Sequence, residues 1–183
     1  SGRLDGSRNW LYASLAPRSD PIEQLSLAVV RASGLPNGGD VLRGRAANDF
    51  SSLHQQAELL LSHDSNQRFV IYVDQFEELF SRSSDEKQGA DFLALLTEAV
   101  AAKDGRVTVI LSIRSDFLSQ CTAYPKLLSL INQHFRLVGA MSSQELALAI
   151  IKPALAVGAE IEPGLVVQMI ADMKGEPGML PLM

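Results

Sequence analysis

The sequence predicts an α/β fold in which helices flank a parallel sheet and an all-helical segment follows. Two continuous apolar runs, at residues 69–73 and 107–113, lack the alternation of a half-exposed strand, which indicates strands covered on both faces. Between them, apolar residues recur at helical spacing from Phe92 to Val100, so the order strand–helix–strand predicts a right-handed crossover. We therefore expect an α/β core at residues 1–140 and the beginning of a helical subdomain at 141–183.

The N-terminal part adds one strand and two helices. Residues 10–15 form an aromatic-rich run followed by Ala-Pro, which is typical of a strand that leads into a loop. Asp20 and the proline after it supply an N-cap and a first-turn proline for a helix that ends at Gly34. After a loop rich in glycine, residues 49–63 place apolar side chains on one helical face.

The C-terminal part is expected to contain one weak strand and two helices. Residues 135–138 have the composition of a last strand. A serine pair at 142–143 with Glu145 opens a helix by N-cap chemistry, and Pro153 is expected to kink or end it. A second apolar stripe follows at 165–173.

Composition excludes several classes of protein. With 183 residues, 46% of them hydrophobic and 20% charged, the chain has the balance of a folded domain rather than a disordered or coiled-coil protein. A net charge of -5 gives no positive field for a nucleic-acid backbone. One cysteine excludes an internal disulfide, and no apolar stretch approaches the roughly 20 residues of a membrane span. We expect a soluble protein of the reducing cytoplasm, with neither membrane nor nucleic acid as a partner.

Charged residues follow both buried strands, where an open parallel sheet binds its ligands. Asp74 can hold a magnesium-bound water, and Glu77 or Glu78 can orient an attacking water. Arg114 ends the second strand and can sense or neutralise a terminal phosphate. The alternative is that Asp74 caps a helical turn, that the glutamates face solvent and that Arg114 pairs with Asp116.

The phosphate-binding loop that such a site requires, G-x-x-x-x-G-K-[ST], is not in the sequence. Its nearest imitation, residues 39–46, has Arg in place of Lys and Ala in place of the metal-binding hydroxyl. No G-x-S-x-G elbow is present, and Cys121 has no neighbouring histidine. The spacing leaves open a glycosidase-like carboxylate pair of Asp74 with Asp116, which nothing else in the sequence supports.

Several segments together resemble the novel STAND branch of the signal-transduction ATPases, P-loop proteins similar to the AAA+ and NACHT groups. The most specific are RFVIYVDQFEELF at 68–80, ILSIRSDF at 110–117 and GEPGMLPL at 175–182. Residues 10–21 and 152–158 extend the resemblance over nearly the whole chain.

The resemblance implies roles for particular residues. Asp74 would be the Walker B magnesium residue, Glu77 and Glu78 the candidates for orienting water, and Arg114 the arginine of the sensor strand. Pro181 lies in an element like the Gly-x-Pro by which the family's helical lid approaches the nucleotide base, although its composition also fits a helix start.

The sequence also departs from the family pattern. Gln75 stands where many related ATPases have Asp or Glu, which puts the rate of hydrolysis in doubt. Family members begin with a strand, a P-loop and its helix, so we interpret this chain as a fragment without the Walker A segment. Because that strand lies between the strands at 107 and 135 in family sheets, residues 135–138 should pair with the 107 strand directly, or a neighbouring chain should fill the gap.

The implied function is that of an intact parent that binds Mg²⁺ and ATP and acts as a nucleotide-dependent regulatory switch, with other protein domains or its own copies as partners. Whether the parent hydrolyses ATP stays open, and the fragment alone should bind neither ligand. One alternative is a non-catalytic protein-interaction scaffold with a degenerate NTPase fold. Another is an AAA-type loader acting on DNA, against which the charge balance counts.

Overall fold

A computed structural model describes residues 6–34, 51–61, 66–81, 86–103 and 105–172. The chain divides into two compact units between His134 and Phe135, and each is treated by itself. In the first unit the elements follow one another as η1 (Ser7–Asn9), β1 (Leu11–Leu15), α1 (Pro21–Ser33), α3 (Ser52–Leu60), β2 (Phe69–Val73), α4 (Glu78–Ser81), α5 (Glu86–Ala101), β3 (Val107–Leu111), η2 (Ser115–Ala123) and α6 (Pro125–His134). The second unit contains α7 (Ser143–Ala156) and α8 (Pro163–Asp172).

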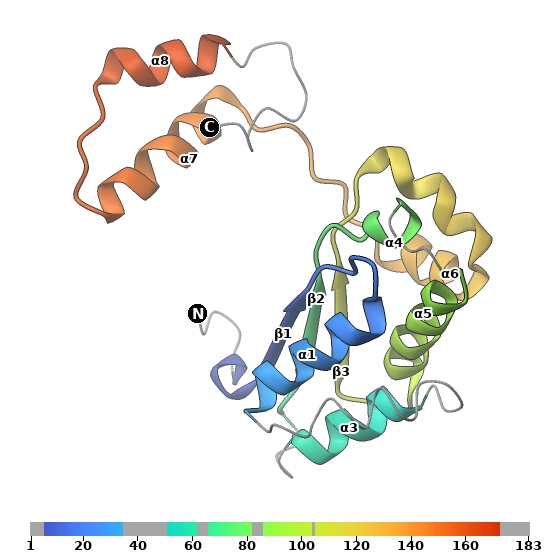
Figure 1. The fold of residues 1–183 in the computed structure, drawn as a ribbon. Helices are drawn as coiled ribbons and strands as arrows, with labels where there is room; N and C mark the ends of the chain where they lie inside the picture. Colours follow the sequence, from blue (N-terminus) through green and yellow to red (C-terminus); the bar gives the residue numbers. More distant parts are fainter. Residues whose placement is uncertain (1–5, 35–50, 62–65, 82–85, 104, 173–183) are drawn as a thin grey trace. The chain divides into compact units, whose positions relative to one another are not determined.

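The three strands form one parallel sheet in the order β1-β2-β3, which confirms the predicted α/β fold (Figure 1). Leu15, Val73 and Leu111 are level with one another, so all three strands end at the same edge. β3 ends before the predicted position 113. The chain that follows β2 takes a left-handed conformation at Gln75, with a φ of 49°, so the regular pairing with β3 does not continue to that position.

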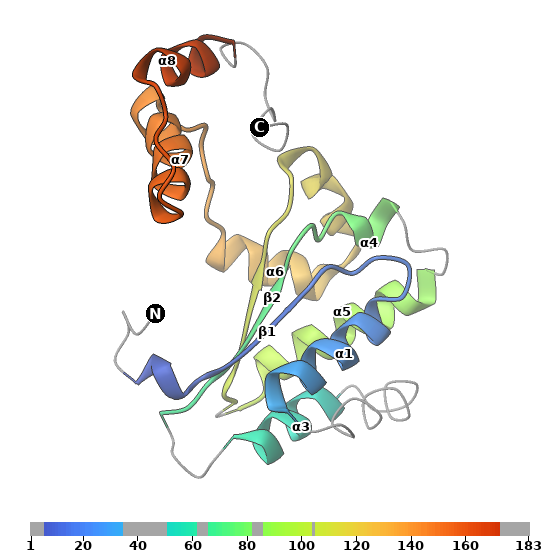
Figure 2. The same ribbon diagram turned by 60° about the vertical axis from the view of Figure 1, so that its left-hand side comes forward.

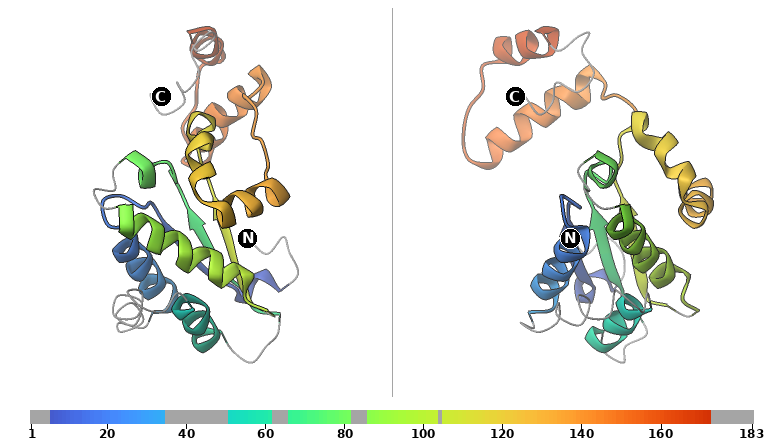
Figure 3. Two further views of the ribbon diagram at one scale, coloured as in Figure 1. Left: turned by 90° about the vertical axis from the view of Figure 1, so that its right-hand side faces the viewer. Right: turned by 45° about the vertical axis from the view of Figure 1, so that its right-hand side comes forward.

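Helices α1, α3 and α5 pack on one face of the sheet (Figures 2 and 3). Asp20 caps α1 as predicted, since its carboxylate accepts a 2.8 Å hydrogen bond from the amide of Glu23. The core between these helices and the sheet consists of fully buried apolar side chains: Leu25 and Val29 of α1, Leu53 of α3, Phe92 and Leu95 of α5, and Phe69, Ile71 and Val73 of β2.

The opposite face of the sheet is exposed in the first unit, so the expectation of strands covered on both faces was wrong for the described residues. Tyr12, Tyr72 and Ile110 on this face are 56%, 36% and 50% exposed. The apolar runs correctly predicted strands, but the apolar character of a strand does not determine whether a helix covers each of its faces. We call this face, on which Tyr12, Ser14, Tyr72, Thr108 and Ile110 are exposed and the central Val70 is buried, the bare face.

Residues 135–138 are not a strand and do not pair with β3, which corrects the first of the two expectations for this segment. Leu137 and Val138 are 77% and 90% exposed. The described sheet offers this segment no neighbouring strand, and a strand forms only where a neighbour satisfies its backbone hydrogen bonds. That a neighbouring chain fills the gap stays a prediction.

In the second unit, α7 begins with the predicted capping box of Ser142 and Glu145. The helix continues through Pro153 to Ala156, so of the two expectations for the proline the end of the helix was wrong, and a kink stays a prediction. The loss of one backbone hydrogen bond at the proline is tolerated here, three residues before the end of the helix. Among the described helices, none combines the length and apolar character that crossing a bilayer requires.

Candidate functional site

Backbone hydrogen bonds place Asp74 at the carboxyl edge of the sheet. The amide of Asp74 donates to the carbonyl of Leu15 at 2.8 Å, and that of Ser112 donates to Val73 at 2.9 Å. After the left-handed turn at Gln75, the amide of Phe76 donates to the carbonyl of Ser112 at 2.9 Å. Because the Phe76 ring is buried, the turn that carries Asp74 is anchored in the core.

One oxygen of the Asp74 carboxylate accepts three hydrogen bonds. Oδ1 lies 2.6 Å from the hydroxyl of Ser112, 3.0 Å from that of Tyr72 and 3.0 Å from the amide nitrogen of Gln75. The Ser112 bond contributes most to lowering the pKa of Asp74 below its usual 3.8; partial burial opposes it, and the bonds from Tyr72 and Gln75 reinforce it. Asp74 is therefore a carboxylate anion at neutral pH.

Glu77 and Arg114 meet at the same edge of the sheet. The backbone amide of Arg114 donates to Oε2 of Glu77 at 3.4 Å. The guanidinium points to Asp116, with Nε 3.2 Å from Oδ1 and Nη2 2.8 Å from Oδ2, and lies 5.8 Å from the centre of the Phe117 ring. This ion pair is the alternative that the sequence offered for Arg114.

The other predicted site residues are distributed differently. Glu78 is half-buried and begins the short helix α4. Pro181 and the P-loop imitation at 39–46 lie outside the described residues. Tyr72 and Ser112 were not predicted as site residues, although each lies two residues before one that was, Asp74 and Arg114 respectively.

The described residues of the site can supply part of the coordination shell of a metal ion but not the whole shell. Among the described residues, no group of three or more His, Cys, Asp or Glu side chains could hold a metal ion. Mg²⁺ in phosphate-transfer sites needs only one or two protein carboxylates, because phosphate oxygens and waters complete its shell. Oδ2 of Asp74 accepts no hydrogen bond from any described residue. Asp74 therefore fits a magnesium ion that a nucleotide brings with it.

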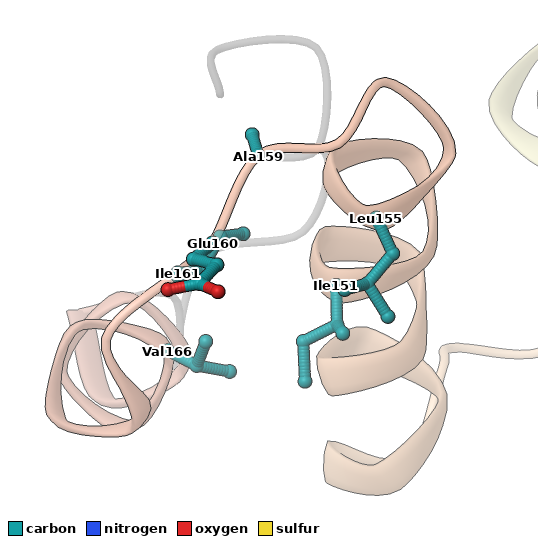
Figure 4. A pocket seen from close by; sticks show the side chains of 6 residues that line it. All are labelled: Ile151, Leu155, Ala159, Glu160, Ile161 and Val166. Atoms are coloured by element: carbon teal, nitrogen blue, oxygen red, sulfur yellow. The ribbon is translucent and has the colours of Figure 1, made fainter.

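A hollow in the second unit has different chemistry. It is an open depression between α7 and α8, in which Ile151 and Leu155 face Val166 across the gap (Figure 4). Its wall is apolar except for Glu160, so we do not assign it a reaction.

Comparison with known proteins identifies the family. Neither the curated proteins nor the solved structures contain a match to this chain. The family model described as Novel STAND NTPase 1 matches residues 2–183, nearly the full length. A three-stranded parallel sheet flanked by helices is consistent with part of a P-loop NTPase domain. The chain therefore belongs to the Novel STAND NTPase 1 family.

Proposed function

We propose that this chain is the Walker B and sensor part of a nucleotide-binding switch, which binds Mg²⁺ and ATP once a P-loop unit joins the sheet. The observation that carries the proposal is the convergence of Asp74, Glu77 and Arg114 at the carboxyl edge of a parallel sheet. Ligands bind at this edge in open α/β sheets. Family membership supports the same conclusion.

In this proposal each residue has a distinct task. Asp74 would hold the magnesium ion through a bound water, and the ion would supply positive charge beside the phosphates. Glu77 is the better candidate for orienting the attacking water, because its carboxylate faces the end of β3, whereas Glu78 begins α4. Arg114 must exchange Asp116 for a phosphate, so nucleotide binding would change the conformation at the end of β3. Pro181 would approach the nucleotide base from the helical lid.

The exposed parts of the first unit support the docking of a P-loop unit. β3 has no strand on its outer side among the described residues, and the bare face lies beside that free edge. Parallel sheets are covered on both faces, usually by the helices of their crossover connections. A strand added to β3, with its helix on the bare face, would complete both and supply the amide cradle for the phosphates.

The biological consequence that we propose is regulated assembly in the cytoplasm. The nucleotide state would determine whether the domain associates with other protein domains or with its own copies. The second candidate, a scaffold without nucleotide, is favoured by the ion pair that occupies Arg114 and by Gln75 in place of an acidic residue.

Calorimetry with Mg²⁺ and ATP separates the two candidates. We would titrate the 183-residue chain beside a longer natural chain that carries a P-loop unit. A switch predicts binding by the longer chain only and its loss in Asp74→Ala, but not in Asp91→Ala, which removes a half-buried carboxylate of α5 that pairs with Lys87. Failure of the longer chain to bind would refute the switch and favour the scaffold.

A further inference from the structure

We infer that Tyr72 and Ser112 are positioning residues whose hydroxyl groups occupy Oδ1 of Asp74 and thereby present Oδ2 to the metal. The inference rests on the proposed function and deepens it. It concerns one residue in β2 and one directly after β3, which the register of these two strands brings together.

The two hydroxyls approach the carboxylate from different directions. Tyr72 is in β2, and Asp74 directly follows that strand two residues later, where backbone hydrogen bonds continue the pairing, so both side chains leave the same face. Ser112 follows β3, and the pairing of Val73 with Leu111 places it beside Asp74. The contacts measure 3.0 Å from Tyr72 and 2.6 Å from Ser112.

A further contact fixes the direction of the serine hydroxyl. The amide nitrogen of Gln75 lies 3.2 Å from Oγ of Ser112 and 3.0 Å from Oδ1 of Asp74, and donates toward both. Because Oγ accepts from this amide, its own proton is available for Oδ1. An ionised carboxylate only accepts, so the tyrosine hydroxyl must donate as well.

Three donors saturate one carboxylate oxygen, which has about two lone-pair sites. The other oxygen, without a hydrogen bond from a described residue, is the one with electron pairs to give to a cation or to its water. Groups that orient a metal ligand in this way typically change metal affinity about 10- to 100-fold when they are removed.

A purely structural role does not account for the arrangement. The ends of the strands are already joined by backbone hydrogen bonds from Ser112 to Val73 and from Phe76 to Ser112. The Tyr72 ring lies on the bare face, where it is 36% exposed and contributes little to the core. The hydroxyls are thus additional to what the fold requires.

The test measures Mn²⁺ binding by electron paramagnetic resonance to the ATP complex of a longer natural chain that carries the P-loop unit required by the proposed function. The variants are Ser112→Ala, Tyr72→Phe and the double variant, with Ser112→Thr as the conservative rescue. Thr108→Ala and Tyr12→Phe are matched controls, because both remove a hydroxyl from the same face away from Asp74. A second readout is the χ1 distribution of Asp74 in the metal-free 183-residue chain, from three-bond NMR couplings.

We expect about 10- to 100-fold weaker Mn²⁺ binding in Ser112→Ala and in the double variant, with unchanged metal-free ATP binding and restoration of Mn²⁺ binding by Ser112→Thr. Averaging of the Asp74 χ1 angle is expected only in Ser112→Ala, Tyr72→Phe and the double variant. Wild-type Mn²⁺ affinity in the double variant, with loss in Asp74→Ala, would overturn this inference and leave the proposed function standing. Absence of Mn²⁺-ATP binding by the unmodified protein would overturn both.

Discussion

The hydroxyl of Ser112 donates a 2.6 Å hydrogen bond to Oδ1 of Asp74, a residue 38 positions earlier in the chain. The bond joins the residue that follows β2 to the residue that follows β3, at the edge where Val73 and Leu111 are paired. It makes the pKa of Asp74 depend on a residue at the end of the neighbouring strand.

Ser112→Ala should raise the pKa of Asp74 toward its usual 3.8, because the serine bond is the largest cause of the lowered value. A carboxyl with a depressed pKa in the folded state stabilises the fold above pH 3.8, and this stabilisation is lost as the pH falls through the folded pKa. The variant should therefore be less stable than the wild type at neutral pH and equal to it in strong acid. NMR titration of the Asp74 carboxyl carbon, with Thr108→Ala as control, measures the shift; an unchanged pKa would contradict the prediction.

Phe92→Ala should destabilise the first unit by about 3–5 kcal/mol, since it removes a fully buried ring between α5 and the sheet and leaves a cavity. Val100→Ala on the same helix is the matched control. It removes atoms from a side chain that is 37% exposed and should cost less than about 1 kcal/mol. Urea denaturation of both variants measures the difference. Equal losses would show that α5 does not pack as described.

The strands and the helices with strong periodicity could be predicted from the sequence. The runs at 69–73 and 107–111 are too apolar and too β-branched for a loop, and Asp20 before a proline fixes the start of α1. The segment that forms η2 and α6 was missed because its polar residues weaken the helical pattern. A proline at position 125 with leucines at 127 and 128 was the available signal.

The predictions that were wrong concern features that depend on neighbouring segments of the chain rather than on the local sequence pattern. Residues 135–138 have the composition of a strand but no partner in the described sheet, and the bare face looks like a buried one in the sequence. In the candidate site, Asp74 could be predicted from its place after an apolar run. Tyr72 and Ser112 could not, because their contacts depend on the register between β2 and β3.

Glu58→Gln should destabilise the chain by about 1 kcal/mol at neutral pH, since Arg106 is only 13% exposed and loses its carboxylate partner at 2.6 Å. Because Glu58 is 37% exposed, solvent screens the ion pair, and the expected loss of stability is smaller than for a buried hydrogen bond to a charged group. Arg106 lowers the pKa of Glu58 below 4.5, so the effect should disappear as the pH falls through the folded value. Glu98→Gln, which breaks the exposed pair with Lys126, is the control and should change stability little; equal effects in the two variants would refute the prediction.

Ser142→Ala should shorten or destabilise α7 by about 1 kcal/mol, because Oγ of Ser142 accepts a 3.3 Å bond from the amide of Glu145. The neighbouring Ser143→Ala removes a hydroxyl already inside the helix and serves as control. Hydrogen exchange at the first amides of α7 measures the difference. Faster exchange in both variants alike would rule out a specific capping role.

Ile110→Lys should change stability little in the 183-residue chain and lower it in a longer chain whose P-loop unit covers the bare face. In the 183-residue chain the side chain is half-exposed on the bare face, so we expect a change in the free energy of unfolding within about 0.5 kcal/mol. In a longer natural chain whose P-loop unit covers that face, the same substitution would bury a charge, and the loss of stability should exceed about 1 kcal/mol. Val100→Lys on α5, at a position of similar exposure but on the other side of the sheet, should behave alike in both lengths. If Ile110→Lys is also tolerated equally in both, the P-loop unit does not dock on the bare face.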